Sequence, residues 1–292
     1  MDEATALGQI EDLVDAAGDD AAIVGGLAIT TDMLHERTDF PEGTTKYTAG
    51  WRAVGASLSD LAAMGASATA AVAVYAVPSF VQAELEAFIG GATDVCESVG
   101  GSYVGGDLDT HREFTVATTA VGCVDEPVYR SGARSGDGVY VSGSLGRSAA
   151  ALELFRGGAV ERANELFRFN PRVPIGRQFT PVASAMIDSS DGLARSLHQL
   201  ANASDCGFAV DRATIPVDPI VHEVASSEEA IEEYGLFFGE DFELVFTAPE
   251  EHALDGERVD GVPITRIGTA TEASVTIDGE PLPDRGYTHG GG

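Results

Sequence analysis

A chain of 292 residues with 44% hydrophobic side chains is too long for one ordinary core and long enough for two α/β domains. Its formal net charge of −30, with Lys46 the one lysine among 17 basic residues, excludes a surface that attracts nucleic acid or anionic lipid. Such a charge repels itself unless salt screens it, which is typical of a halophilic enzyme from a salt-rich cytoplasm.

The first half of the chain alternates between predicted strands and helices. Short β-branched segments predict strands, and apolar residues at helical spacing predict helices. Strands are expected at 25–31, ending in a loop at Asp32, at 70–77, buried on both faces, and at 114–124. Helices are expected over 50–65 and over 79–99, the second capped by Ser79.

A polar, glycine-rich stretch, 125–138, marks the expected domain boundary, which divides the chain into 1–125 and 126–292. The second half repeats the alternation. Helices are expected from Gly143 to Phe155, around Leu193–Leu200 and over the acidic segment 218–235. The expected strands are 139–141, 185–187, 244–246, 262–267 and 274–277. An α/β fold of two domains follows from this order of elements.

No segment predicts membrane insertion or export. The longest nearly apolar run, 70–78, is far shorter than the roughly 20 residues of a membrane helix. The chain starts with an acidic segment and no apolar run, so we expect no signal peptide and a soluble, cytoplasmic protein. Cys96, Cys123 and Cys206 are far apart and odd in number, so we expect buried free thiols rather than disulfides or a zinc site.

One pattern recurs along the chain: a short hydrophobic strand runs into a loop that bears an Asp, often with a hydroxyl residue beside it. Carboxylate and hydroxyl oxygens are hard ligands that suit Mg²⁺, and bridging cations would hold a polyphosphate. An acidic pair that precedes a strand, Glu240-Asp241, extends the set. The other instances are Asp19-Asp20, Thr30-Thr31-Asp32, Ser59-Asp60, Gly105-Gly106-Asp107 and Asp188-Ser189-Ser190-Asp191-Gly192.

Each instance also has a purely structural interpretation. Asp19-Asp20 fits an exposed turn, and Asp60 fits a helix cap although it lies within an apolar helical pattern. Asp191 could cap the helix that follows a strand–turn junction. Glu240 and Asp241 could form a plain polar turn. Position in the fold, rather than charge, must separate these alternatives, because acidic residues are abundant throughout the chain.

Phosphate binding has two candidate segments. The chain has no GxxxxGK[ST] motif, and a single lysine makes a strand lysine of the protein-kinase type doubtful. Gly143–Gly146, before a predicted helix, could offer backbone N–H groups to an anion, or could serve tight packing. Arg130 and Arg134, in a glycine loop, could clamp a phosphate or pair with surface carboxylates. The histidines form no triad and no HExxH motif, so no general base is evident.

Taken together, the segments resemble the thiamine-monophosphate kinases, a family of the AIR-synthetase-like ATP-binding superfamily. They follow the family's order from Gly18 to Tyr287. The resemblance implies an N-terminal domain that binds ATP and Mg²⁺ and shares a barrel-like sheet across a homodimer, and a C-terminal domain of the same superfamily type. It implies direct transfer of phosphate from ATP to thiamine monophosphate in the cleft between them. The matching segments are GDDAAIV, TTDML, SLSDLAAMGA, GGD, RSGARSGDGVYVSGSLGRSAA, IDSSDGL and GEDFELVFT.

The resemblance also implies roles for individual residues, carried over where the motifs match. Asp60, Asp32 and Asp191 are the expected catalytic residues. The positions similar to magnesium ligands are Asp20, Thr30, Thr31, Asp32, Asp60, Asp107, Asp188 and Asp191. Those similar to ATP contacts are Gly106, Asp107, Arg130 and Ser190, and those similar to contacts of the thiamine substrate are Asp39, Glu240 and Tyr287. The chain departs from the family where Leu108-Asp109 replaces threonines and where Asp39 replaces a frequent histidine.

Other readings stay open. A selenophosphate synthetase would carry a reactive N-terminal cysteine, and a hydrogenase-maturation relative would end in one; this sequence shows neither. Aminoimidazole ribonucleotide synthetase is the nearest alternative enzyme, although the GEDFEL segment and Tyr287 weigh against it. A non-catalytic protein that binds thiamine phosphates or nucleotides is the alternative from another class. No partner other than the small-molecule substrates and a second copy of the chain is expected.

Overall fold

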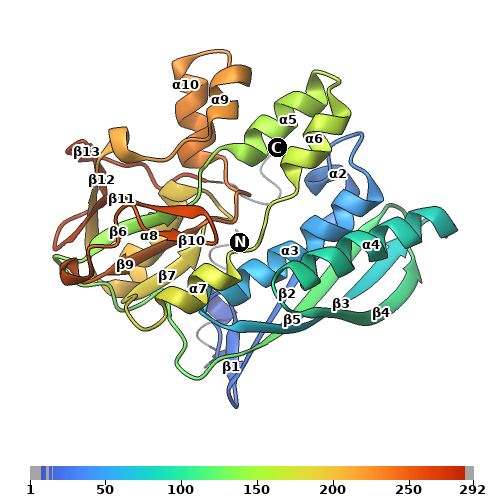
Figure 1. The fold of residues 1–292 in the computed structure, drawn as a ribbon, viewed down its shortest axis with the longest axis horizontal. Coiled ribbons are helices and arrows are strands. Elements are labelled where there is room, and N and C mark those ends of the chain that lie inside the picture. Colours follow the sequence, from blue (N-terminus) through green and yellow to red (C-terminus); the bar gives the residue numbers. More distant parts are fainter. Residues whose placement is uncertain (1–7, 11–12, 15, 287–292) are drawn as a thin grey trace.

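The computed structural model describes residues 8–10, 13–14 and 16–286. They form two β-sheets with helices packed against them, one sheet in each half of the chain (Figure 1). The N-terminal sheet has five strands in the order β1-β2-β5-β3-β4. The C-terminal sheet has eight, in the order β13-β12-β8-β11-β6-β9-β7, with β10 paired to β11 outside that path. The predicted two-domain α/β architecture is confirmed, and neither sheet closes into a barrel.

In the N-terminal half, two long helices cover one face of the sheet (Figure 1). The apolar period of the predicted helix holds, because Val54, Leu58 and Leu61 are all buried. The helices are α2 (Glu36–Asp39), α3 (Lys46–Ala63) and α4 (Gln82–Ser98). The strands are β1 (Ala22–Val24), β2 (Leu27–His35), β3 (Ser67–Val77), β4 (Ser102–Thr110) and β5 (Thr115–Cys123).

Helices α3 and α4 touch through glycines. A Cβ atom added at Gly50 would lie 2.1 Å from the carbonyl oxygen of Phe88, and one at Gly91 would lie 1.9 Å from that of Tyr47. Any side chain at these positions would push the backbones apart. The close contact fixes the position of α3, whose last turn carries Asp60.

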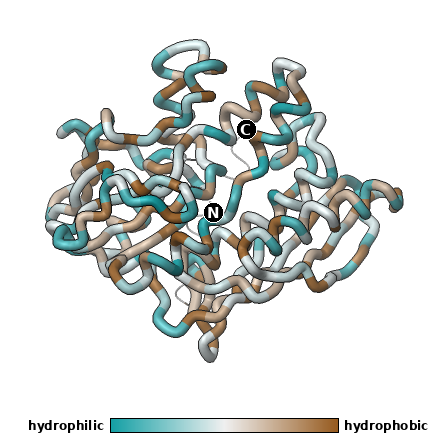
Figure 2. The backbone as a smooth tube through the Cα atoms, viewed as in Figure 1, coloured by the Kyte–Doolittle hydropathy of each residue, from teal (hydrophilic) through white to brown (hydrophobic). Residues whose placement is uncertain are grey.

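Strand β3 is not buried on both faces, contrary to the prediction. Ala71, Ala73 and Tyr75 are buried, whereas Val72 and Val74 are 37% and 42% exposed. Helices cover one face only, so burial alternates along the strand. Hydrophobic stretches of the N-terminal sheet are visible at the lower right of Figure 2.

Two predicted loops and one predicted cap are also wrong. Asp32 lies inside β2, because β2 pairs with β5 without interruption from Leu27 to His35. Asp107 lies inside β4, which pairs with β3 past that point. Helix α4 begins at Gln82 rather than at Ser79, and its N-cap residue makes no side-chain hydrogen bond. Strand pairing and helix start depend on neighbouring segments here, and local residue preference does not decide them.

In the C-terminal half, all the predicted helices and strands occur. Helix α8 packs against β7, β8 and β9, whereas α5 and α6 lie toward the N-terminal half (Figure 1). The helices are α5 (Arg147–Arg156), α6 (Val160–Phe167), α7 (Val173–Phe179), α8 (Leu193–Ser204), α9 (Pro219–Val224) and α10 (Glu228–Glu232), together with the short η1 (Arg212–Thr214), η2 (Glu233–Phe237) and η3 (Glu250–His252). The strands are β6 (Gly138–Ser142), β7 (Ala185–Asp188), β8 (Gly207–Val210), β9 (Leu244–Ala248), β10 (Arg258–Val259), β11 (Val262–Thr271), β12 (Thr276–Ile277) and β13 (Glu280–Pro281).

The two halves pack on each other through several elements. Helix α3 contacts α6, α7 and β7, and one buried core cluster contains residues from both halves. The chain passes between the sheets in the segment after β5 and before β6. The division into 1–125 and 126–292 stays a prediction. Among the described helices, none combines the length and the hydrophobicity that crossing a membrane requires.

All three cysteines are free, as expected, but they are not all buried. Cys96 is buried between α4 and the sheet, and Cys206 is partly buried. Cys123 is exposed at the end of β5, which corrects the expectation for that residue. The outward position follows from the alternation of β5, whose other face carries the buried residues.

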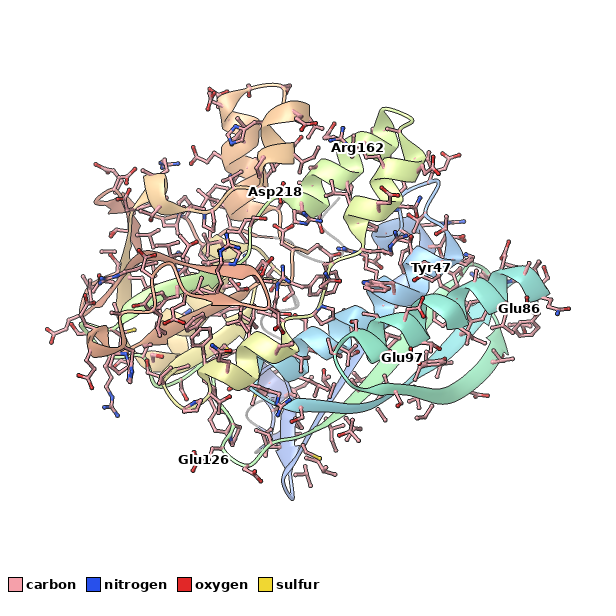
Figure 3. The ribbon with its side chains drawn as sticks, viewed as in Figure 1. Tyr47, Glu86, Glu97, Glu126, Arg162 and Asp218 are labelled. Atoms are coloured by element: carbon pink, nitrogen blue, oxygen red, sulfur yellow. The ribbon has the colours of Figure 1, made fainter. Side chains whose placement is uncertain are left out.

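Acidic side chains are exposed in both described halves of the chain, and we predict that salt stabilises the fold. Glu86 and Glu97 on α4 and Glu126 between the sheets all point outward (Figure 3). Screening weakens the repulsion within a protein of net charge −30, so the melting temperature should rise from low to molar KCl. Thermal melts over a KCl series would check this. A flat or falling melting temperature would contradict it.

Candidate active site

Three aspartates from separate elements converge between the two halves. Asp20 lies just before β1, Asp60 lies in the last turn of α3, and Asp188 ends β7. Each contributes an oxygen, and these oxygens all lie within 4.8 Å of one another. Hydroxyl groups orient two of the carboxylates. Thr30 donates to Asp60, and Ser59 donates to Asp188 at 2.7 Å.

The convergence raises the pKa values of these carboxyl groups. Burial, and then the neighbouring charge of Asp20, raises the pKa of Asp188 to about 7. Burial raises the pKa of Asp60 well above its ordinary value, and the charges of Asp188, Asp20 and Asp32 act in the same direction. Nearby, burial and Asp20 raise the pKa of Asp19 to about 6. Buried like charges oppose ionisation of one another, so the cluster is suited to a bound cation.

A cavity of about 230 Å³ opens beside the cluster. The metal ligands that its wall offers are carboxylate and hydroxyl oxygens. These are hard ligands, and both their chemistry and their number suit Mg²⁺. The lining of the cavity is mostly polar, and it contains most of the residues predicted to bind metal. The lining consists of Asp20, Thr30, Thr31, Asp32, Leu34, Arg52, Ala56, Asp60, Ser190, Asp191, Glu240 and Phe242.

Asp107 and Gly106 do not join this group within one chain. They lie in the edge strand β4, and β5 and β3 separate that strand from β2, which carries Asp32. A Cβ atom at Gly106 would lie 1.7 Å from the carbonyl oxygen of Ala73, so close pairing of β4 with β3 is sufficient to explain this glycine. Asp107 is exposed, and its Oδ1 accepts a hydrogen bond from the N–H of Leu108.

Arg130 belongs to the carboxylate cluster rather than to an isolated phosphate clamp. Its guanidinium donates to Asp20 at 2.9 Å, and its backbone N–H donates to Asp19 at 3.1 Å. Arg130 therefore offsets part of the negative charge around Asp20. Ser190 lines the cavity, and its N–H donates to Asp188 at 3.2 Å.

A second, larger cavity of about 1030 Å³ adjoins the first. Aromatic rings and charged groups line it, including Asp39 and the lone lysine, Lys46. Asp39 is buried and accepts hydrogen bonds from the N–H of His35 at 2.7 Å and from the hydroxyl of Thr38 at 2.8 Å. Glu240 lines both cavities, so it marks their junction.

The structure also decides between the interpretations of the acidic motifs. Asp241 is not a solvated turn residue, because its carboxylate accepts from the N–H groups of Gly146 and Ser148 and so caps α5. It occupies the helix end that could have held an anion. Asp191 does not cap α8, whose N-cap is Gly192. Asp60 lies at the C-terminal end of α3, where N-capping is impossible.

Sequence reasoning missed the arginine that holds Glu240 and a second arginine outside the two cavities. Arg52 pairs with Glu240, and Arg172 pairs with the buried Glu243. The sequence did contain a signal for Arg52, because an arginine is unusual within the apolar pattern of a predicted helix. Tyr287, expected to contact the substrate, lies outside the described residues. The last described residue is Gly286. A Cβ atom added to it would lie 2.3 Å from the carbonyl oxygen of Asp191, so the two residues are in close contact.

Comparisons with known proteins agree with this arrangement. The N-terminal domain of AIR synthase related proteins matches residues 18–124, and their C-terminal domain matches residues 134–278. The chain is therefore a two-domain protein of the AIR synthase related class. The thiamine-monophosphate kinase of Halobacterium salinarum is 57% identical over 99% of this chain and 100% of its own. That of Methanospirillum hungatei is 38% identical over 94% of each.

A solved structure extends the similarity to the whole fold. The complex of AaThiL with AMPPCP and TMP superposes with a TM-score of 0.88 at 28% identity and covers 99% of this chain and 97% of that one. The chain therefore belongs to the thiamine-monophosphate kinase family.

Proposed function

We propose that the protein transfers the γ-phosphoryl group of ATP to thiamine monophosphate and forms thiamine diphosphate. The observation that carries the proposal is the pair of adjoining cavities with Glu240 in their common wall. One cavity holds the carboxylates suited to a metal-bound nucleotide. The other is large, partly aromatic and acidic, as a cationic thiazolium requires. Membership of the family supports both assignments.

We propose Asp20, Asp60 and Asp188 as the residues that hold Mg²⁺, with Thr30, Thr31, Asp32 and Asp191 at the same cavity. Bound Mg²⁺ would supply charge stabilisation for the phosphoryl group in transfer. The carboxylates would position the nucleotide through the metal, and Arg130 and Ser190 lie beside them. An acceptor phosphate oxygen is ionised at neutral pH, so no general base is needed. In the described residues, no histidine lines either cavity.

The test is an assay of the purified protein in high salt with ATP, Mg²⁺ and thiamine monophosphate. Thiamine diphosphate, separated by chromatography, is the expected product, with one ADP formed for each molecule. Thiamine without a phosphate serves as the control acceptor and should not react. Binding of thiamine monophosphate without turnover would favour the non-catalytic alternative. Turnover only with formylglycinamidine ribonucleotide would favour aminoimidazole ribonucleotide synthetase.

We further propose a homodimer formed through the uncovered face of the N-terminal sheet. This face carries apolar side chains on adjacent strands, more than solvent exposure favours. A second copy could bring Gly106 and Asp107 of its edge strand to the carboxylate cavity, which one chain does not do. The exposed apolar residues on this face are Leu27, Ile29, Met33, Val72, Val74 and Val104. A salt-rich cytoplasm is the proposed location, supported by the net charge and by the Halobacterium relative.

The homodimer predicts the effect of a charge on that face. Val74→Asp would place facing carboxylates in the interface, so the variant should be a monomer when the unchanged protein is a dimer. Ile89→Asp on α4, similarly exposed at 41%, is the matched control and should stay dimeric. Light scattering after size exclusion in molar KCl would measure both. A monomeric unchanged protein, or a dimeric Val74→Asp variant, would contradict the proposed interface.

A further inference from the structure

Arg52 is an arginine buried in a strongly acidic protein, with a side-chain exposure of 1%. It lies in α3, two turns before Asp60, and lines the carboxylate cavity. Its Nη1 donates to the carbonyl oxygen of Phe167 at 2.8 Å. Its Nη2 donates to the carbonyl oxygen of Glu240 at 3.0 Å and to Oε2 of the same residue at 2.5 Å. The guanidinium thus ties α3 to two distant segments.

Aromatic rings fix the orientation of this guanidinium. Its central carbon lies 3.7 Å from the ring centre of Phe167 and 5.5 Å from those of Phe169 and Phe242. Phe169 and Phe242 stack on each other at 4.1 Å. A planar group between rings, with donors at set angles, has little freedom to rotate. Arg52 therefore presents its Nη2 in one direction only, toward Glu240.

Glu240 is held in a backbone conformation that few residues adopt. Its φ is +63°, in the left-handed region. The N–H donates to the carbonyl oxygen of Ser190 at 2.7 Å, and the carbonyl oxygen accepts from the hydroxyl of Ser148 as well as from Arg52. Three elements thus fix the backbone, and Arg52 also fixes the side chain. Strained residues that are held this way are common at functional sites.

We infer that Arg52 is a positioning residue for the acceptor substrate. It holds the Glu240 carboxylate at the junction of the two cavities through Oε2 and leaves Oε1 for the cationic thiazolium of thiamine monophosphate. This inference rests on the proposed function, and it assigns Arg52 to the acceptor side of the site rather than to ATP. A lysine at position 52 would keep the positive charge but lose the planar, two-pronged geometry.

Glu243, three residues after Glu240, takes part in a second ion pair that provides a matched control. Arg172 donates to both carboxylate oxygens of Glu243 in a pair that is also buried, with side-chain exposures of 16% and 1%. Neither residue lines either of the two cavities. Arg172→Lys therefore perturbs a buried ion pair three residues along the chain from Glu240 without changing the cavity wall. Any general loosening of the loop should appear in both lysine variants.

The experiment compares Arg52→Lys with Arg172→Lys by steady-state kinetics for each substrate and by thermal melts in molar KCl. Arg52→Lys should raise the KM for thiamine monophosphate about tenfold or more, the scale of a charged hydrogen bond, and leave the KM for ATP within about twofold. Arg172→Lys should lower the melting temperature and leave both KM values unchanged. Arg52→Met should raise the acceptor KM further if it folds; if it does not fold, the lysine variants decide the question.

A double-mutant cycle adds a readout that a purely structural role would not move. Glu240→Gln alone should raise the acceptor KM, and adding Arg52→Lys to it should change the KM little, because the two residues act through one contact. Additive effects, an unchanged acceptor KM in Arg52→Lys, or an equal rise in the KM for ATP would overturn the inference. Failure of the proposed function is distinguishable, since the unchanged protein would then form no thiamine diphosphate.

Discussion

Replacing Asp60 by Asn should lower the turnover number by at least about 100-fold, the scale expected when a transition state is deprived of one electrostatic interaction. Asp60 is the member of the cluster whose carboxyl faces the charges of Asp188, Asp20 and Asp32 together. An amide keeps the size and the hydrogen bond from Thr30 but offers no negative charge to a cation. The effect should fall on turnover, with the KM for thiamine monophosphate changed much less.

The same substitution should make the metal-free protein more stable. Burial and neighbouring carboxylates oppose ionisation of Asp60, so a neutral side chain removes repulsion from the folded state. Glu97→Gln removes one charge from the exposed face of α4 and serves as the control, with unchanged turnover. Initial rates and melting curves for both variants would check the pair of effects. Near-normal turnover in a folded Asp60→Asn protein would remove Asp60 from the site.

The sequence was sufficient for elements whose pattern is local. Helix α3 and strand β5 were predicted because apolar spacing and β-branched content depend on a few neighbouring residues. The exposed face of β3 was not predictable, because it depends on which face the helices cover. Asp32 was placed in a loop because its pairing with Thr118 in β5 lies far along the sequence. Long-range pairing overrides local preference at these positions.

For the same reason, only part of the candidate site could be predicted from the sequence. Motif resemblance named Asp20, Asp60 and Asp188, but only the fold shows that residues from three separate elements meet within 4.8 Å. Their roles stay predictions. The contacts of Arg52 with Phe167 and Glu240 span 115 and 188 residues, and no spacing rule predicts such pairs. The sequence left Asp241 open between a member of the acidic site set and a plain polar turn, whereas its role as the cap of α5 requires knowing that α5 begins beside it.

Removal of Mg²⁺ should abolish activity. The stability of the metal-free protein should also fall as the pH rises. The pKa of Asp188 is raised from 3.8 to about 7 in the folded protein. Between these values the folded state binds a proton that the unfolded chain has released, so stability falls as the pH rises. The destabilisation is absent below the unfolded pKa and complete above the folded one. The raised pKa values of Asp60 and Asp19 act with the same sign.

Mg²⁺ should reverse that trend, because it binds the ionised carboxylates and must displace protons at low pH. At about 100 times its Kd, a ligand that binds only the folded state adds about 2.7 kcal/mol, or about 5 °C in melting temperature for a chain of this size. We expect that rise near pH 8 and a clearly smaller one near pH 5. Melting curves with EDTA or Mg²⁺ across this range, at constant molar KCl to screen the surface charge, would measure it. Asp188→Asn is the comparison: it should flatten the pH dependence of the EDTA curves and weaken the response to Mg²⁺. An Mg²⁺ response that is equal at both pH values, or turnover that survives EDTA, would refute the assignment of this carboxylate cluster as the metal site.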